Sequence, residues 1–332
     1  MVTLTRAPSE PAAPVVRPPA SAGLLEKARF VHTNRRLGEL AGYDVVHAHC
    51  STMSPLSYAT IGAAGQVPTA ITVHSLWRRY TAFYGGADHL LRWSRWPVAW
   101  SAVSTAAATA VQRAARSELR VDVVPNGIDL GEWPAHQHQP VARHLRIVSV
   151  MRLAPRKRPL PLLRILRQVR AALPPDIRVS AVIVGDGPRM GAARRFIASH
   201  DMTSWVTFTG HLPRARIDEH LANADVFVAP STLESFGIAA LEAAASGIPV
   251  IGRSGTGMSD FLDLGVSGLL LPSDAGIAAA LADIGLGAIT LHAPSHEQLS
   301  QMSWSAVVER TDRLYERAGA MPIRRPLQKQ AS

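Results

Sequence analysis

The 332-residue chain is predicted to be an α/β protein built on parallel β-sheets, and three observations carry this prediction. Short apolar, β-branched runs alternate with helix-favouring segments along most of the chain. The clearest unit, residues 225–252, reads as strand, loop, helix and strand in immediate succession. The length is sufficient for two domains, each with its own core. Because strands that alternate with helices need crossover connections, we predict parallel sheets covered by helices.

The first part of the chain contains five predicted strands. The first, residues 2–5, is followed by a stretch rich in Pro and Ala at 7–23, which we interpret as an irregular connection. The other four are the apolar runs at 44–49, 69–74, 99–104 and 121–124. Helices are expected at 24–40, at 55–64 and in the Ala-rich stretch before Val121.

The second part repeats the alternation with six predicted strands. They are the runs at 146–152, 179–184, 205–209, 225–229, 249–251 and 268–271. Helices are predicted at 159–172, 236–245 and 304–315, and Gly247 followed by Pro249 is a typical helix stop. The polar, basic tail at 321–332 is expected to be disordered.

Two acids mark the unit at 225–252 as a candidate ligand site. Glu234 lies in the loop before the predicted helix, and Glu242 lies four residues after Ile238, one turn deeper and about 6 Å away. The backbone N–H groups at the helix start, from Ser235, Phe236, Gly237 and Ile238, would form an anion site. This arrangement suits a nucleotide diphosphate and its ribose. The alternative is that Glu234 is an ordinary first-turn acid and Glu242 a solvated helix residue.

The same stretch resembles a known family. Two Glu residues separated by seven positions, with Phe-Gly after the first and Ala-Ser-Gly-Ile-Pro-Val after the second, are similar to the retaining glycosyltransferases of family 4. DVVHAH, TVHS, AVS and VPNGID follow the order of that family's N-terminal domain. The resemblance implies the GT-B architecture, in which two Rossmann-like domains face each other across a cleft. We expect domains at 1–140 and 141–300, and a C-terminal helix at 301–320 that packs back across the junction.

The resemblance assigns roles to residues of the second domain. An Arg and a Lys five residues apart, here Arg152 and Lys157, would neutralise the donor diphosphate together with the helix start at 235–238. Glu234 would hold sugar hydroxyls and Glu242 the ribose. The loop formed by Gly210, His211 and Leu212 would meet the nucleotide base. For residues 210–212 the alternative is a plain connecting loop. For the stretch with Arg152 and Lys157 the alternative is a solvated charge run.

His74 is the candidate catalytic residue of the first domain. It ends a predicted strand, where the family places a histidine beside the sugar-transfer centre; a hydrogen-bonded strand-end histidine is the alternative. His47 and His49 share one strand face beside Cys50, but no further ligand pattern accompanies them, so we reject a zinc site. No Asp-x-Asp pair ends a strand, and we therefore expect no obligatory metal and no cofactor.

The N-terminal domain is expected to be incomplete. The family opens with a strand, a Gly-rich loop and a helix that help to hold the donor phosphates and the acceptor, whereas this chain has no glycine before Gly23. A misplaced gene start, a truncation or true loss of the element would each explain the difference. Activity of the chain as it stands is therefore an open question.

The charge balance favours an anionic partner, with the Ala- and Arg-rich codon usage of a GC-rich genome as the alternative. The net charge is +10, with basic residues spread over many segments and no compact nucleic-acid motif, so we expect phosphorylated or membrane partners rather than nucleic acid. A lipid-linked or phosphorylated acceptor fits this balance. The single cysteine excludes an intramolecular disulfide, and with no signal peptide or apolar span we expect a cytoplasmic protein, peripheral on the inner face of the membrane if it binds lipid.

One segment concentrates aromatic and basic residues. Residues 76–100 contain four of the seven tryptophans, interleaved with Arg78, Arg79, Arg92 and Arg95. This pattern fits an anionic bilayer interface, and it fits a partly buried cleft wall equally well.

We therefore predict a retaining glycosyltransferase that moves a sugar from a nucleoside-diphosphate sugar to an acceptor hydroxyl. With no obvious enzymic nucleophile, front-face attack is expected, in which the donor phosphate accepts the proton. The alternatives are a GT-B nucleotide-sugar epimerase and a non-catalytic nucleotide-sugar-binding or regulatory protein. A nucleic-acid binder is a weaker alternative that rests on charge alone.

Overall fold

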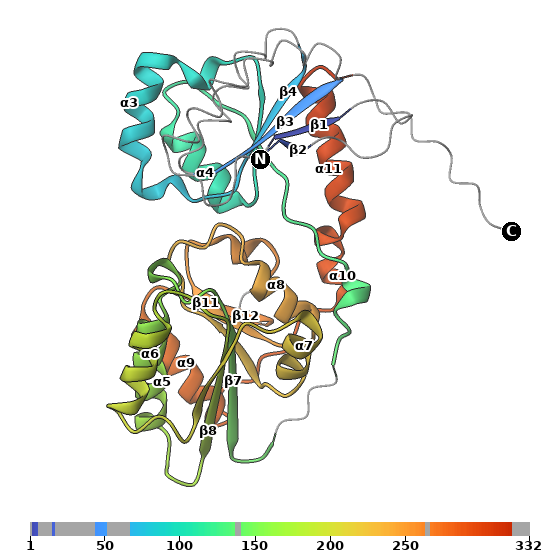
Figure 1. Cartoon of the computed structure of the whole chain (residues 1–332). Coiled ribbons are helices and arrows are strands. Elements are labelled where there is room, and N and C mark those ends of the chain that lie inside the picture. Colours follow the sequence, from blue (N-terminus) through green and yellow to red (C-terminus); the bar gives the residue numbers. More distant parts are fainter. Residues whose placement is uncertain are drawn as a thin grey trace, which may run out of the picture. The chain divides into compact units, whose positions relative to one another are not determined.

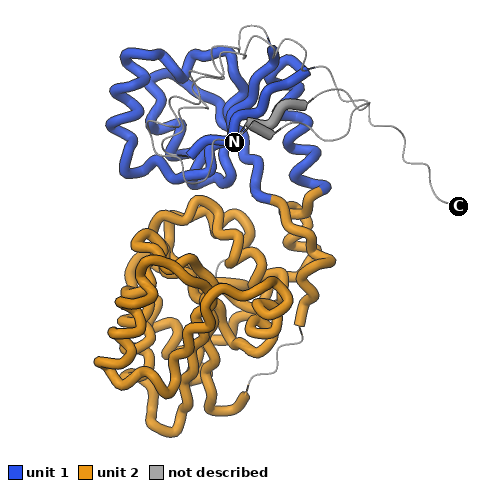
Figure 2. The backbone as a smooth tube through the Cα atoms, in the orientation of Figure 1, with its two compact units in different colours: residues 1–126, 305–332 blue, residues 127–304 orange. Residues whose placement is uncertain are grey.

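The computed structural model of the chain describes residues 2–5, 15–16, 44–51, 67–136, 141–262 and 266–320. Contacts divide the chain into two compact units: unit 1 is Met1–Asn126 with Ser305–Ser332, and unit 2 is Gly127–Trp304 (Figure 2). The predicted helices at 24–40 and 55–64, the tail at 321–332 and the expected boundary at residue 140 lie outside the described residues.

Unit 1 is built on a six-stranded sheet in the order β2-β1-β3-β4-β5-β6. The strands are β1 (Val2–Thr5), β2 (Val15–Val16), β3 (Val45–Cys50), β4 (Thr69–Val73), β5 (Ala99–Ala102) and β6 (Val121–Val123). From β3 to β6 the pairing is parallel, as predicted. The edge differs from the prediction, because β1 pairs antiparallel with both β2 and β3, and β2 interrupts the stretch expected to be irregular.

Three described helices accompany this sheet: α3 (Thr81–Leu91), α4 (Thr105–Ala114) and α11 (Trp304–Arg317). α3 packs against α4 (Figure 1). α11 returns from the far end of the chain, and its buried Val307 and Leu314 join the core of unit 1. Arg317 fixes its last turn by donating to Asp122 at 2.7 Å and to the Trp100 carbonyl at 2.9 Å. The C-terminal helix is therefore an integral part of unit 1.

For the tryptophans of segment 76–100, the structure favours the partly buried alternative. Trp77, Trp93 and Trp100 are buried, with at most 3% of their surface exposed. Trp77 stacks on Tyr84 with ring centroids 3.7 Å apart, and Trp93 lies edge-on to Trp77 and Trp100. These three rings form a core beneath α3, so their indoles are not available to a bilayer.

Unit 2 is built on a six-stranded sheet in the order β12-β11-β10-β7-β8-β9, and every pairing is parallel. The strands are β7 (His144–Val150), β8 (Arg178–Val184), β9 (Val206–Gly210), β10 (Val226–Ala229), β11 (Val250–Arg253) and β12 (Gly268–Leu271). All six lie within two residues of the predicted runs. Continuous Val, Ile and Leu runs specify them because both faces of such a sheet are covered.

Helices cover both faces of this sheet (Figure 1). α5 (Pro159–Ala172), α6 (Met190–Ala198) and α9 (Asp274–Gly285) pack together on one face, and their apolar sides form the main core of unit 2. α7 (Arg214–Ala222) and α8 (Ile238–Ala245) lie on the other face, and the short α10 (His296–Leu299) follows near the end of the unit. This is the doubly wound arrangement that the sequence predicts.

The turn after β8 holds the loop after β7. Gly185 has a φ of +123°, and a Cβ there would lie 2.0 Å from the Met151 carbonyl oxygen. The two loops are joined by hydrogen bonds from the Met151 N–H to the Val184 carbonyl, 2.9 Å, and from the Leu153 N–H to the Asp186 carbonyl, 2.8 Å. Only glycine permits this close approach, so Gly185 positions the backbone on either side of Arg152.

The substitution Gly185→Ala tests this packing. We expect it to destabilise unit 2 by roughly 2–5 kcal/mol, because it combines a strained φ with a backbone clash. Gly287→Ala is the matched control: Gly287 also has a positive φ, +73°, but no atom lies within 4 Å of a Cβ built there. The control should lose only about 1 kcal/mol. Equal losses in urea unfolding would show that the contact with Met151 is unimportant.

Candidate functional site

The strand order of unit 2 reverses between β7 and β10. The chain runs outward from β7 through β8 to β9 on one side, and from β10 through β11 to β12 on the other. In open parallel sheets, ligands bind outside the carboxyl ends of the strands at such a switch point. The loops that leave the switch point here are 151–158, after β7, and 230–237, after β10. They carry six of the predicted site residues: Arg152 and Lys157 in the first loop, and residues 234–237 in the second.

An ion pair joins the two loops. Lys157 Nζ donates to Glu234 Oε2 at 2.5 Å, and the two side chains retain only 28% and 14% of their exposure. A small cavity of about 30 Å³ lies beside the pair, lined also by Gly237, Ala240 and the ends of β7 and β10. The structure therefore brings together two site residues that are 77 positions apart in the chain.

Arg152 lies at the same edge but remains exposed. Its guanidinium forms no ion pair with any residue that the structure describes, whereas the backbone on either side of it is held by the bonds to Val184 and Asp186. A fixed backbone that carries an uncompensated cation is suited to an anionic ligand.

The start of α8 differs from the prediction in its boundary. The helix begins at Ile238, two residues later than expected, and Gly237 precedes it with a φ of +98°. Phe236 lies outside the helix and is buried against Phe261, so its side chain belongs to the core. The amides of Ile238 and Ala239 donate to no described group, and no side chain caps the helix. The anion site expected at 235–238 is thus shifted toward the first turn of α8.

Glu242 lies one turn further along α8 and is partly buried. Burial raises the pKa of its carboxyl to about 7, against a smaller opposing effect of Arg214. Arg214 is itself engaged, because it pairs with Glu132 and lies over the Trp133 ring at 5.1 Å. Without a strong local partner, Glu242 has the capacity to accept hydrogen bonds from a ligand.

The predicted base-binding loop follows β9, the edge strand of the sheet. Gly210 has a φ of +74°, and its carbonyl accepts from the Gly185 N–H at 2.8 Å. His211 is exposed and Leu212 half-buried. These residues lie at the carboxyl edge of the parallel sheet, the same edge as the ion pair.

His74, in unit 1, follows β4 and belongs to a histidine pair. Its Nε2 lies 2.9 Å from His49 Nδ1, so one ring donates to the other. Burial lowers the pKa of His74, and burial together with His74 lowers the pKa of His49 to about 4. Both rings are therefore neutral at pH 7, and the shared hydrogen bond fixes their tautomers relative to one another.

The third histidine of this region has partners of its own. His47 is buried, with Nε2 2.6 Å from Thr72 Oγ1 and Nδ1 3.0 Å from the Tyr315 hydroxyl. Burial also raises the pKa of the Cys50 thiol to about 12, which makes it an inert core residue. Across the described part of the chain, no group of three His, Cys, Asp or Glu side chains is placed to hold a metal ion.

Sequence reasoning missed a second ion-pair network beside the site. Arg158 donates to both Asp274 carboxylate oxygens at 2.8 Å and to the Pro230 carbonyl at 3.0 Å, and Arg253 approaches the same carboxylate at 3.4 Å. Three cations lie at the start of α5: Arg156, Lys157 and Arg158. Glu234 and Asp274 neutralise Lys157 and Arg158, which leaves Arg156 at the helix start and Arg152 after β7. The sequence gives one signal for Asp274, which is its position directly before a run of apolar, helix-favouring residues.

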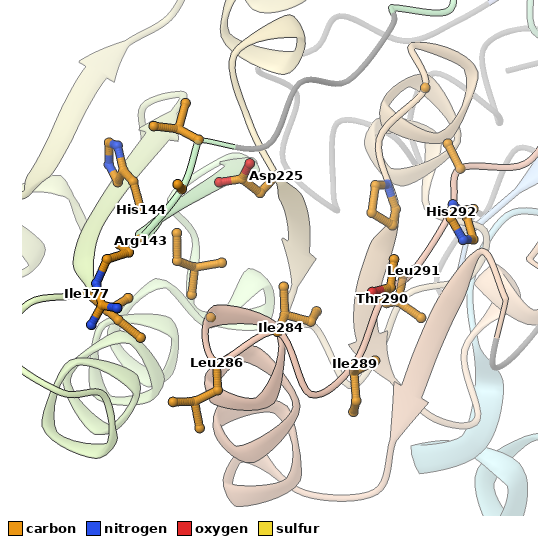
Figure 3. Close-up of a pocket in the computed structure, with 18 residues that line it drawn as sticks. Arg143, His144, Ile177, Asp225, Ile284, Leu286, Ile289, Thr290, Leu291 and His292 are labelled. Atoms are coloured by element: carbon orange, nitrogen blue, oxygen red, sulfur yellow. The ribbon is translucent and has the colours of Figure 1, made fainter.

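A larger pocket of about 630 Å³ lies at the opposite, amino-terminal edge of the same sheet (Figure 3). Its lining is mainly apolar, with side chains such as Ile177, Ile284 and Leu286 (Figure 3). The charged groups there are engaged, because Asp225 accepts from Arg146 at 2.8 Å and Arg143 pairs with Asp176. Among the described residues this pocket therefore offers no unpaired charge to a diphosphate.

Comparison with known proteins gives two family matches. Residues 136–289 match the model of the group 1 glycosyl transferases, and residues 1–132 match the model named Glycosyltransferase Family 4. In structure, the chain is similar to HepE of Anabaena, crystallised with UDP and glucose, with a TM-score of 0.66 and 22% identity over 90% of this chain and 84% of that one. This likeness confirms the predicted α/β GT-B fold.

Two relatives illustrate the range of the sequence matches. One subunit of the phosphatidylinositol N-acetylglucosaminyltransferase of Arabidopsis thaliana is 28% identical over 63% of this chain and 46% of its own length. The glycogen synthase of Mycobacterium tuberculosis is 27% identical over 82% of this chain and 68% of its own length. The chain thus spans about half of the plant relative and about two thirds of the bacterial one.

The contrast between the two site cations yields a stability prediction. Arg152→Ala should change the free energy of unfolding by no more than about 0.5 kcal/mol, because Arg152 is exposed and forms no ion pair with a described residue. Lys157→Ala should cost about 1–3 kcal/mol, because it leaves the carboxylate of Glu234 without its partner. Urea unfolding of both variants measures the difference. Equal losses would contradict the roles assigned to these two side chains.

Proposed function

Because the chain belongs to the group 1 glycosyltransferases, we propose that it transfers a sugar from a nucleoside-diphosphate sugar to an acceptor hydroxyl with retention of configuration. The observation that carries this proposal is the arrangement at the switch point of unit 2. There the Lys157–Glu234 pair, the free amides that open α8 and Glu242 line one edge of the sheet.

The donor diphosphate is the natural ligand of this edge. Its charge grows as the bond to the sugar breaks, so a catalyst must hold positive charge in place for it. Arg152 supplies an unpaired guanidinium, and the amides of Ile238 and Ala239 supply the positive end of a helix. Lys157 supplies an ammonium that Glu234 holds in position in the free protein. Together these groups match the roles expected for residues 152, 157 and 235–238.

The remaining groups of unit 2 fit the rest of the donor. In the proposal Glu234 accepts from sugar hydroxyls, Glu242 accepts from the ribose hydroxyls, and the loop Gly210–His211–Leu212 meets the base. The high pKa of Glu242 supports the ribose assignment, because a carboxylate without a local partner gains most from two hydroxyl donors.

In unit 1 we assign the reacting-centre role to His74. A neutral imidazole with its tautomer set by His49 donates or accepts at one defined ring nitrogen. Retention without an enzymic nucleophile then requires the departing phosphate to accept the proton of the acceptor hydroxyl. The sugar–phosphate bond breaks as the bond between the sugar and the acceptor oxygen forms, and the nucleoside diphosphate leaves with the proton.

A nucleotide-sugar-binding protein without activity is the second candidate. It would keep the same contacts in unit 2, so binding alone does not separate the two functions. Release of the nucleoside diphosphate from a nucleotide sugar, by transfer or by slow hydrolysis, separates them. The plant relative is named for phosphatidylinositol, which favours a lipid or phosphorylated acceptor for this chain as well.

Calorimetric titration tests the donor site. The chain should bind one of UDP, GDP and ADP, and Glu242→Ala should weaken binding by about 1–3 kcal/mol through the loss of the ribose acceptor. Glu219→Ala is the control, since Glu219 is an exposed acid of α7 whose ion pair among the described residues is with Arg216, one turn away. Failure of all three nucleotides to bind, or equal effects of the two substitutions, would show that the site is misassigned.

The pH dependence of binding is a separate prediction. Glu242 is half protonated near pH 7 in the free protein, and its ionised form is the better acceptor, so affinity should rise with pH. A nucleotide sugar is the suitable probe, because the terminal phosphate of a free nucleotide itself titrates near about pH 6. Between about pH 6 and about pH 8 we expect a roughly tenfold gain, and Glu242→Gln should flatten the profile.

The carboxyl of Glu242 also affects the stability of the fold, which should fall with rising pH where the affinity for the nucleotide sugar rises. Its folded pKa is raised, so its contribution to stability is fully present below the ordinary pKa of 4.5 and is lost as pH rises through about 7. Glu242→Gln should therefore melt at a higher temperature than the wild type at pH 8, with a smaller difference at pH 5. A lower melting temperature of the variant at pH 8 would refute the burial effect.

A further inference from the structure

The helix α3 lies at the side of unit 1 (Figure 1), and an exposed apolar stripe runs along it. Its members are Tyr80, Phe83, Leu90 and Leu91, with 47%, 59%, 81% and 59% of their surface exposed. Their spacing places them on one side of a helix of 3.6 residues per turn. Next to the stripe on the helix surface, Tyr84 and Asp88 are buried and anchor α3 to the rest of unit 1. The stripe is therefore turned away from the core of unit 1.

The chain around the stripe is rich in positive charge, and the exposed acid nearest to it in sequence is Glu118, directly after Ser117. Between residues 76 and 117 the chain has six arginines and a single acidic residue, Asp88. Asp88 is 3% exposed, and its carboxylate accepts from the Ser94 N–H and Oγ, both at 2.8 Å, and from the Arg116 N–H at 2.6 Å. Burial alone would raise the pKa of Asp88, but these hydrogen bonds and the charge of Arg116 hold it below its ordinary value. The negative charge of Asp88 is therefore stabilised by these donors inside the fold.

A polar pocket opens at the carboxyl end of α3, next to the stripe. It measures about 250 Å³ and is lined by Asp88, His89, Arg92, Ser94, Arg95, Arg116 and Ser117. The guanidinium groups of Arg92 and Arg95 form no salt bridge with any residue in the described part of the chain. Ser94 and Ser117 hydroxyls, 2.6 Å apart, lie at the same pocket. A concavity of three arginines with hydroxyls suits a phosphate group.

Arg92 occupies a backbone position that normally selects glycine. Its φ of 48° and ψ of 38° are left-handed, and it ends α3 by donating its N–H to the Asp88 carbonyl at 2.8 Å. An arginine at such a position is conformationally unfavourable. The sequence therefore keeps a cation at the pocket where a glycine would stabilise the fold.

We propose that this surface, the arginine pocket with the α3 stripe, docks the chain on an anionic lipid bilayer. A headgroup phosphate occupies the pocket formed by Arg92, Arg95 and Arg116, and Phe83, Leu90 and Leu91 enter the boundary between headgroups and acyl chains. Exposed leucines separate this occupant from nucleic acid, which makes little use of aliphatic side chains. In the part of the chain that the structure describes, no helix is long and apolar enough to cross a bilayer.

Vesicle co-sedimentation tests the proposal on the full chain. Vesicles of equal parts phosphatidylglycerol and phosphatidylcholine should bind it, vesicles of phosphatidylcholine alone should not, and added salt should weaken binding. The double variant Arg92→Gly, Arg95→Gln should lose roughly fivefold in vesicle affinity per arginine. Phe83→Ser with Leu90→Ser should lose roughly tenfold per side chain.

The variants carry their own folding control. Arg92→Gly relieves the left-handed strain, so the single variant should melt at or above the wild-type temperature while it binds vesicles more weakly. Arg194→Gln with Arg195→Gln removes the same charge from α6 of unit 2, where both arginines are exposed, and should leave vesicle binding unchanged. Nucleotide binding by unit 2 should survive in every variant.

Several outcomes would overturn the proposal. Equal sedimentation with neutral and anionic vesicles would exclude the arginine pocket, and equal losses in the unit 2 control would reduce the effect to net charge. Competition by inorganic phosphate without any effect of Phe83→Ser and Leu90→Ser would indicate a soluble phosphate ligand instead. Tighter binding of single-stranded RNA than of anionic vesicles, abolished by the same arginine changes, would assign the surface to nucleic acid.

Discussion

The parallel pairing of β7 with β10 is the constraint on which the site depends. The register places Ile147 against Val226 and Val148 against Phe227. An ion pair lies at each end of this β7–β10 seam, the line along which the two strands pair. Arg146 pairs with Asp225 at the amino end at 2.8 Å, and Lys157 pairs with Glu234 at the carboxyl end at 2.5 Å. Each pair joins residues nearly eighty positions apart. The seam therefore sets the distance between the two loops that would hold a donor.

The same seam explains which cations remain for a ligand. Arg158 is neutralised by Asp274 and stabilises the loops of the free protein, whereas Glu234 holds the ammonium of Lys157 in position at the site. Arg152 is left unpaired among the described residues, and the helix start at Ile238 has unused amides. A site that is charged but held in place needs little rearrangement when an anion arrives, which is the arrangement that electrostatic catalysis requires.

Much of the fold was predictable from sequence because buried parallel strands are nearly continuous apolar runs. The exceptions have local physical causes. The start of α8 was placed two residues early because residue propensity does not reveal the left-handed backbone of Gly237. The antiparallel β1 was missed because its short run carries no signal of direction. The burial of Trp77, Trp93 and Trp100 was left open, because an aromatic pattern does not show which rings stack beneath a helix.

The candidate site was predicted in part, and mostly through resemblance. Spacing alone left Glu234 and Glu242 ambiguous, and it could not show that Lys157 meets Glu234, since that contact depends on sheet order rather than on sequence distance. The hydrogen bond between His49 and His74 has the same origin, because β3 and β4 are neighbours that pair His49 with Thr72 and Cys50 with Val73. The arginine pocket of unit 1 was visible only as charge, because its shape depends on the burial of Asp88.

Hydrogen–deuterium exchange of the full chain, with and without saturating nucleoside diphosphate, is the most direct test of where the donor binds. The switch-point assignment predicts slower exchange at the start of α8 and in the loop from Arg152 to Lys157. It also predicts no change in the segment 284–293, which lines the apolar pocket at the other edge of the sheet. Protection confined to that segment, with the start of α8 unchanged, would contradict the account.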